Sequence, residues 1–375
     1  NPYLSLPETF IQQGIQPIAE TSNLYNGMGE MNGSHYTNYP PINQLCFLIA
    51  AIFTSKSIFG SVIVLRMMII FADIGILYFG KKLLEKLNLP IKNIFWYVLN
   101  PFIIIEMTGN LHFESLMLFF LVWSLYLLQQ KKWIWAAFLL ACSISVKLIP
   151  LLFLPLFYQW FVSFRKTSQT SQQTSQVFKT CEVYKLIGFY TIVIATTLLL
   201  FLPFYSSELI NNYMDSVGLW FRNFEFNASF YYIFREIGYS FRGWNEIAII
   251  GKIMPILTIL FLGFITFFRK NTSLKQLITA MLFGLSFYYF TTTTMHPWYL
   301  ATLLILSVFT KYRFPMIWSL VIILSYQAYS NTPWKENLWF VAAEYFVVFL
   351  FLIWELNSTS KRNLMSIPCH SVAIY

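Results

Sequence analysis

The chain has 375 residues, of which 57% are hydrophobic, 20% aromatic and only 11% charged, and its mean hydropathy is +0.58. A soluble domain carries about 25% charged residues, so this composition excludes a soluble enzyme and indicates an integral membrane protein. The formal net charge of +9 could suggest nucleic acid as a partner. However, the Lys and Arg residues cluster in short loops between apolar segments, as cytoplasmic loops do, so nucleic-acid binding is not expected.

The first segment, residues 1–41, contains no Lys or Arg and is predicted to lie outside the membrane. The chain opens at Asn1 without a signal-peptide pattern, so we expect a further segment upstream. The short apolar stretch 42–53 is predicted to be a re-entrant or interfacial helix. If it were a full span, the basic cluster at 81–92 would lie outside. Residues 1–57 therefore form the first predicted region.

Apolar segments of helical length follow, and about eleven of them are predicted to cross the membrane. They run at 58–80, 93–106, 113–129, 133–148, 150–162, 186–204, 247–268, 275–291, 297–310, 314–330 and 338–355. With Asn1 outside, this number of crossings places every basic cluster on the cytoplasmic side. The predicted fold is an all-α polytopic membrane protein with a transmembrane domain at 58–355, a cytoplasmic loop at 163–185, an outer loop at 205–246 and a cytoplasmic tail at 356–375.

Several predicted spans are shorter than the roughly 20 residues that cross hydrocarbon, notably the two that meet around Lys147 and Pro150. Partial helices survive in a membrane only where their ends are buried in protein or line a wet cavity. We therefore expect a cavity that opens to the outer face.

Unusual polar residues lie in the turns that the topology places on this outer side. Glu106, Asn110, His112 and Glu114 share one turn, Lys147 ends a span, and His296 lies in another turn. Arg66 and Asp73 lie within one span near one face, where a structural contact is the commoner explanation, although intramembrane ions tend to be functional.

Pro150 and Pro297 stand where a helix begins again, a position that suits proline because its missing N–H would be unpaired there anyway. Each puts the partial positive charge of a helix N-terminus beside Lys147 or His296. This combination predicts an anion site, and at an outer leaflet the obvious anion is a lipid phosphate.

Carboxylates beside such a site suggest a general base that deprotonates an acceptor hydroxyl while phosphate leaves a sugar carbon. Tyr39, Trp298 and Tyr299 suit a sugar, whose C–H faces stack on aromatic rings. Structural explanations also exist: the carboxylates could be solvated loop residues, Lys147 could extend to the interface, and the aromatic residues could form an interfacial belt. No cluster of His, Cys and Asp indicates a metal, and no cofactor is predicted.

Four motifs in order resemble the bacterial polytopic glycosyltransferases of the GT-C fold, the mannosyltransferase-like enzymes that use a polyprenyl-phosphate sugar. They are NPFIIIEMTGNLHFESLMLFFLVWSLYLL (100–128), WAAFLLACSISVKLIPLLFLPL (135–156), NYPPINQ (38–44) and HPWYL (296–300). The resemblance implies a membrane enzyme that moves a hexose, often mannose, from a polyprenyl-phosphate donor at the outer face of the cytoplasmic membrane, with inversion of the anomeric carbon. The acceptor would be a glycan or a lipid-linked molecule.

The same resemblance implies a catalytic Asp shortly before an Asn-Pro-Tyr triplet, and this chain opens with NPYLSLP. We therefore expect the main base upstream of Asn1, and the chain as given to be inactive or severely impaired. Glu106, His112 and Glu114 are the catalytic candidates within the chain. The predicted substrate-binding residues are Tyr39, Asn110, Lys147, His296, Trp298 and Tyr299.

Two other functions stay open at the sequence level. A polytopic transporter would place its polar residues near the bilayer midplane, often with paired repeats, whereas here they lie toward one face. A lipid-linked glycan polymerase or ligase would rely on Arg and His in a large outer loop, and Arg222, Arg235 and Arg242 are compatible with it.

Overall fold

The structure, a computed structural model, describes residues 1–162, 172–222, 224–331 and 334–365, with the side chains of 172–182, 220–222 and 359–365 left undescribed. Throughout this described part the regular structure is helical, and the one β contact is an isolated bridge between Phe226 and Thr294. The prediction of an all-α protein is therefore confirmed.

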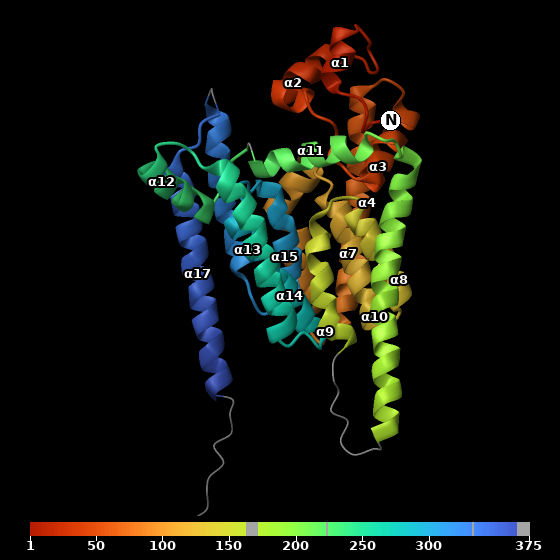
Figure 1. Cartoon of the computed structure of the whole chain (residues 1–375), viewed down its shortest axis with the longest axis vertical. Coiled ribbons are helices and arrows are strands. Elements are labelled where there is room, and N and C mark those ends of the chain that lie inside the picture. Colours follow the sequence, from red (N-terminus) through yellow and green to blue (C-terminus); the bar gives the residue numbers. More distant parts are fainter. Residues whose placement is uncertain (163–171, 223, 332–333, 366–375) are drawn as a thin grey trace, which may run out of the picture.

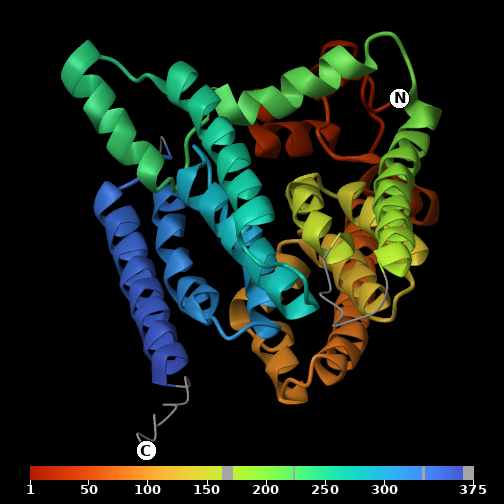
Figure 2. The ribbon, with the colours of Figure 1, turned by 60° about the horizontal axis from the view of Figure 1, so that its bottom comes forward.

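Four helices within the described residues are long and apolar enough to cross a membrane. They are α4 (Ile58–Lys86), α10 (Gln172–Phe201), α13 (Ile247–Phe268) and α17 (Leu338–Met365). Helices α10 and α17 flank the molecule on opposite sides (Figure 1 and Figure 2). Pro101–Gly109 and α7 (Glu114–Gln129) would add a fifth span if the pair, bent by 114°, were counted as one.

The expectation of about eleven crossings is thus not confirmed, because the other apolar segments form shorter helices. Pro150 and Pro155 give the predicted 150–162 span a 3-10 conformation in η3 (Ile149–Phe157), which is followed by a single α-turn in α9 (Tyr158–Phe161). Helix α8 (Trp133–Ile144) has 12 residues, so it is about 18 Å long, short of a hydrocarbon core of about 30 Å.

Two of the apolar helices lie inside the protein. Every residue of α15 (Leu300–Val308) is buried, as are most residues of α14 (Leu274–Thr291). Their backbone ends are thus shielded by neighbouring helices, which is the condition under which partial helices persist in a membrane. The remaining elements between the long helices are η1 (Ile91–Ile94), α5 (Phe95–Val98), α6 (Pro101–Ile103), η2 (Ile104–Gly109), η4 (Leu202–Phe204), η5 (Pro297–Tyr299), α16 (Phe314–Val321) and η6 (Ile322–Ser330).

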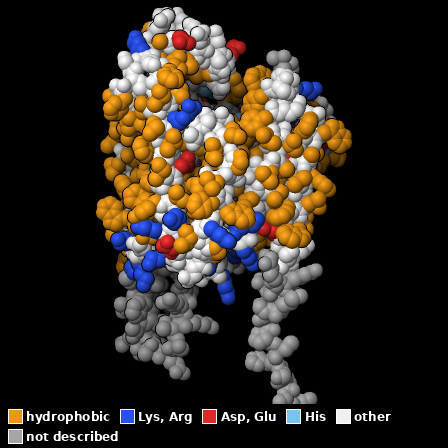
Figure 3. Space-filling model, turned by 180° about the vertical axis from the view of Figure 1, so that it is seen from behind, with side chains coloured by type: hydrophobic (Ala, Val, Ile, Leu, Met, Phe, Trp, Pro, Cys, Tyr) orange, Lys and Arg blue, Asp and Glu red, His pale blue; other side chains and the backbone are white. Residues whose placement is uncertain are grey.

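The two ends of the molecule differ in charge. Lys and Arg side chains gather at one end, which we call the basic end (Figure 3). The opposite end carries α1 (Pro7–Gln12), α2 (Thr21–Gly33) and α11 (Leu209–Arg222), and α11 runs across the long helices (Figure 1 and Figure 2). Helix α12 (Phe230–Arg242) also lies toward this end, so the predicted loop 205–246 contains two helices.

Helix α3 (Pro41–Thr54) occupies the stretch predicted to be re-entrant or interfacial. Its first turn is bound to the turn that follows α8. The backbone N–H of Ile42 donates to the carbonyl of Ser145 at 2.9 Å, and the side chain of Asn43 donates to the carbonyl of Val146 at 3.5 Å. This junction brings the residues just before α3 close to Lys147.

Candidate active site

The turn between α6 and α7 is shaped by its local sequence and by one partly buried cation. Asn100 caps α6 by accepting a hydrogen bond from the N–H of Phe102 at 3.0 Å, and the chain then widens into the π-helical turn η2. Arg66 of α4 donates to the carbonyls of Thr108 and Gly109 at 2.9 and 3.1 Å. Arg66 thus makes a polar contact that joins α4 to this turn. Such π-turns occur frequently at functional sites.

Glu106 lies in this turn and is 1% exposed. Its Oε1 accepts hydrogen bonds from the hydroxyl of Tyr326 in η6 and from the amide of Asn110, the latter at 3.3 Å. Its Oε2 lies 3.6 Å from Nε2 of His112. One carboxylate oxygen is thus fully engaged, and the other faces the imidazole.

Glu114 begins α7 and forms an ion pair with Lys147, which follows α8. Glu114 is 2% exposed and the Lys147 side chain 15%, so the pair is largely removed from water. The Lys147 ammonium lies 5.9 Å from the ring centre of Tyr39 and 5.8 Å from that of Tyr299, distances at which cation–π attraction contributes. The Lys147 side chain therefore points into the protein, toward Glu114 and these two rings.

Four ring side chains join the two turns. The rings of His112 and Trp298 are stacked, with centroids 4.0 Å apart, and Trp298 is stacked on His296 at 4.5 Å. His296 in turn meets the edge of Tyr299 at 5.4 Å. All nine residues predicted for the site therefore form one connected set of contacts.

The charge of His296 differs from its expected role as a cation. Burial lowers the pKa of its imidazole to about 3, and the nearby Lys147 ammonium acts in the same direction. His296 is therefore neutral at physiological pH. Among the nine predicted residues, Lys147 is then the one that carries positive charge toward an anion, and His296 can offer only hydrogen bonds and a ring face.

Four further aromatic residues, which the sequence did not single out, complete this site. Phe224 and Phe226 lie against His296, with ring centroids 5.8 and 5.4 Å away. Phe226 also contacts Tyr329, and Tyr329 contacts Tyr326, each at 5.7 Å. In a chain with 23 Tyr and 39 Phe, no local pattern distinguishes these positions.

The segment around Phe226 is held beside the turn that contains His296. The N–H of Phe226 donates to the carbonyl of Thr293 at 3.1 Å, and the N–H of Met295 donates to the carbonyl of Phe226 at 2.8 Å. Thr294 donates its hydroxyl to the carbonyl of Phe224 at 3.0 Å. The loop between α11 and α12 is therefore part of the site wall.

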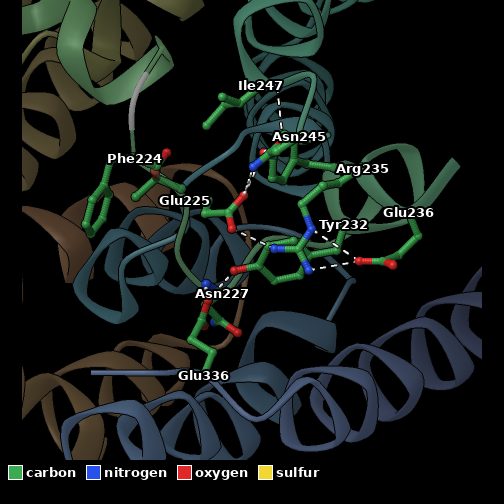
Figure 4. A network of polar contacts seen from close by, with 11 residues as sticks. Phe224, Glu225, Asn227, Tyr232, Arg235, Glu236, Asn245, Ile247 and Glu336 are labelled. Carbon is green, nitrogen blue, oxygen red and sulfur yellow. Dashed lines mark hydrogen bonds and ion pairs between the residues drawn. The ribbon is translucent and has the colours of Figure 1, made fainter. Parts of the chain in front are cut away.

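Helix α12 fixes the same segment through Glu225 (Figure 4). Glu225 accepts hydrogen bonds from Arg235 and Tyr231, both at 2.6 Å, and from the amide of Asn245 at 3.2 Å. Arg242 pairs with Glu246 at 3.1 Å. Two of the three arginines considered for a polymerase or ligase are thus engaged within the loop, and the side chain of Arg222 lies outside the described residues.

A family model described as "Alpha-(1->6)-mannopyranosyltransferase, N-terminal domain" matches residues 12–163. The match includes α3, the turn with Glu106, the whole of α7 and Lys147. No curated protein matches the chain. The family is one of glycosyltransferases, and the match supports the resemblance to mannosyltransferase-like membrane enzymes of the GT-C type. Over residues 12–163, the chain is thus similar to the N-terminal domain of an α-(1→6)-mannopyranosyltransferase family.

Proposed function

We propose that this protein transfers a hexose, most simply mannose, from a polyprenyl-phosphate carrier to a glycan or lipid-linked acceptor, with inversion at the anomeric carbon. The proposed location is the cytoplasmic membrane, with the site toward the exterior. This orientation follows if the basic end faces the cytoplasm, as positively charged loops do.

The observation that carries the proposal is the contact between two turns far apart in the sequence. Glu106, His112 and Glu114 come from one turn, and His296 and Trp298 come from the other, about 180 residues later. A carboxylate pair, a single ammonium and flat aromatic faces are what a sugar phosphate needs. The rings stack on sugar C–H faces, and the ammonium compensates the phosphate charge.

In the proposed reaction, an acceptor hydroxyl oxygen attacks the anomeric carbon from the side opposite the phosphate. The bond between that carbon and the phosphate oxygen breaks, and its electron pair leaves with the phosphate. The hydroxyl proton passes to a carboxylate base, the Asp that the family resemblance implies. Lys147 stabilises the leaving phosphate, while Glu106 and Glu114 position donor, acceptor and Lys147.

Glu114 has a specific part in this scheme. In the present structure it neutralises Lys147, so the ammonium does not stand unpaired in a buried site. When a phosphate binds, Lys147 interacts with both the phosphate and the Glu114 carboxylate. Its positive charge then lies beside the bond that breaks.

The experiment that tests the proposal uses membranes that contain the protein expressed from its full-length gene. They are incubated with radiolabelled polyprenyl-phosphate mannose, and in parallel with labelled lipid-linked oligosaccharide. We expect label to pass from the monosaccharide donor to acceptor, and Lys147→Ala to abolish the transfer. Transfer of the whole oligosaccharide would instead identify a polymerase or ligase. Uptake of a free solute without either reaction would identify a transporter.

A further inference from the structure

Helix α12 exposes its apolar face, whereas an ordinary surface helix buries its apolar face against the core. Its apolar residues recur at the spacing of one helical face, and all five are exposed. They are Phe230 (38%), Ile233 (57%), Phe234 (43%), Ile237 (47%) and Phe241 (84%). A contiguous exposed apolar face of this kind marks a contact with a membrane or with another protein.

The opposite face of α12 is attached to the rest of the protein by hydrogen bonds and an ion pair. Tyr231 and Arg235 both hold Glu225, and Tyr232 donates its hydroxyl to Glu336 (Figure 4). Arg235 also stacks over the ring of Tyr232 at 4.5 Å. Turning the helix to bury its apolar face would break these bonds and leave charged groups unpaired, so the apolar face stays outward.

The neighbours of this face are helices that can cross a membrane. Phe230 contacts Phe349 of α17, with ring centroids 5.4 Å apart, and α12 also packs on α13. Both spans carry exposed apolar side chains of their own, among them Phe346, Leu350, Ile253 and Ile256. The apolar face of α12 therefore continues the surface that α13 and α17 present to lipid.

The residues at the C-terminal end of α12 are of the types that occur at the boundary of a bilayer. Trp244 is exposed, and the Arg242 guanidinium lies 5.3 Å from the centre of its ring. Trp and Arg are enriched where apolar chains meet headgroups. Figure 1 places α12 near the ends of α13 and α17 that lie away from the basic end.

We propose that α12 is an interfacial helix that binds the lipid bilayer through Phe230, Ile233, Phe234, Ile237 and Phe241, at the boundary between headgroups and acyl chains. Its opposite face holds Glu225, whose neighbours Phe224 and Phe226 lie against His296. The bilayer thereby fixes the position of one wall of the candidate site. The lipid contact itself does not depend on the proposed glycosyl transfer.

The test uses the full chain, with its four native cysteines replaced, in phosphatidylcholine nanodiscs. Ile237→Cys carries an environment-sensitive fluorophore, and Glu236→Cys, one residue away on the solvent side, is the matched control. We expect the label at 237 to show blue-shifted emission and to be quenched by nitroxide-labelled lipid but not by iodide. The label at 236 should be quenched by iodide.

Quenching of both labels by iodide would show that the face lies in water and would overturn the proposal. A label at 237 that neither quencher reaches would also overturn the proposal. The face would then be covered by protein, either a second copy of the chain or a partner. Ile233→Cys reports on the same face and replaces Ile237→Cys if that variant does not elute as a folded, monodisperse protein.

Discussion

Lys147 and Glu114 form an ion pair that joins the turn after α8 to the first residue of α7. The two residues are 33 positions apart in the sequence, and both side chains are largely buried. Their pairing keeps a positive charge available inside an apolar protein, at the position where the proposed reaction needs it.

Replacing one partner of this pair should cost more stability than replacing both. Lys147→Met leaves the Glu114 carboxylate buried without its cation, which typically costs about 3–5 kcal/mol. The double variant Lys147→Met, Glu114→Gln removes the unpaired charge and should recover most of that loss. Thermal unfolding in detergent measures both effects. Transfer activity should stay lost in the double variant, and recovery of activity would show that Lys147 does not contact the phosphate.

The hydroxyl of Tyr326 should matter far more than its ring. Tyr326→Phe removes the hydrogen bond to Oε1 of Glu106, leaving Asn110 as the donor to that oxygen. Hydrogen bonds to charged groups contribute about 1.5–3 kcal/mol, so we expect kcat/KM to fall by roughly 10- to 100-fold. Steady-state transfer from labelled donor measures the effect.

Tyr329→Phe is the matched control for this variant. The ring of Tyr329 packs on that of Tyr326, but no described hydrogen bond joins its hydroxyl to Glu106. Its kcat/KM should stay close to that of the unchanged protein. Equal losses in the two variants would mean that the ring stack, and not the hydrogen bond, positions Glu106.

The residues of the site could be predicted from the sequence because polar groups are scarce in this chain. A Glu or Lys amid apolar segments must find a partner, and Glu106, Glu114 and Lys147 meet the few partners available. The prolines at 150 and 297 marked the breaks where such groups gather, and both do begin 3-10 turns.

Tyr326 and Phe226 could not be predicted in the same way. They reach the site by tertiary packing from η6 and from the loop before α12, and aromatic residues occur throughout the sequence. The number of crossings was overestimated for a related reason. Hydropathy does not distinguish a span that faces lipid from a short helix such as α15, which is apolar because protein surrounds it.

The neutral state of His296 predicts how stability depends on pH. Its pKa is about 3 in the folded protein, compared with an ordinary value of 6.5. The unfolded chain therefore binds a proton below pH 6.5 that the folded protein rejects. The stability present above pH 6.5 should fall by up to about 1.4 kcal/mol per pH unit as the pH drops toward 3. Thermal unfolding between pH 7 and pH 4 measures this slope.

His296→Gln is the control for this pH dependence. Glutamine is close in size and does not titrate in this range. The slope of stability against pH should therefore decrease by the contribution of about one proton. If the two proteins show the same slope, His296 also binds the proton in the folded protein, contrary to this prediction.

Trp298 is stacked on two imidazoles, so the size of its ring should decide how firmly His112 and His296 are held where the donor binds. Trp298→Ala removes the surface on which His112 and His296 stack. Stacked aromatic pairs contribute about 0.5–1.5 kcal/mol beyond their burial, so KM for the donor should rise several-fold to about tenfold. Trp298→Phe should restore part of the loss. Trp339→Ala, an exposed tryptophan of α17, should leave KM unchanged.

Asn227 connects the site wall to α17. The stability of variants at this position should depend on the charge of the new side chain and not on its shape. Its N–H donates to Glu336 at 2.7 Å, its amide donates to Glu344 at 3.2 Å, and its carbonyl accepts from Tyr345 at 2.7 Å. Asn227→Ala loses one hydrogen bond and should cost about 1–3 kcal/mol. Asn227→Asp keeps the shape but places a carboxylate against that of Glu344, so it should be less stable than the alanine variant. Lowering the pH should narrow this difference, because a proton then bridges the two carboxylates, and thermal unfolding of both variants at pH 9 and pH 6 measures it. An aspartate variant as stable as the unchanged protein at pH 9 would mean that Glu344 keeps its proton even there.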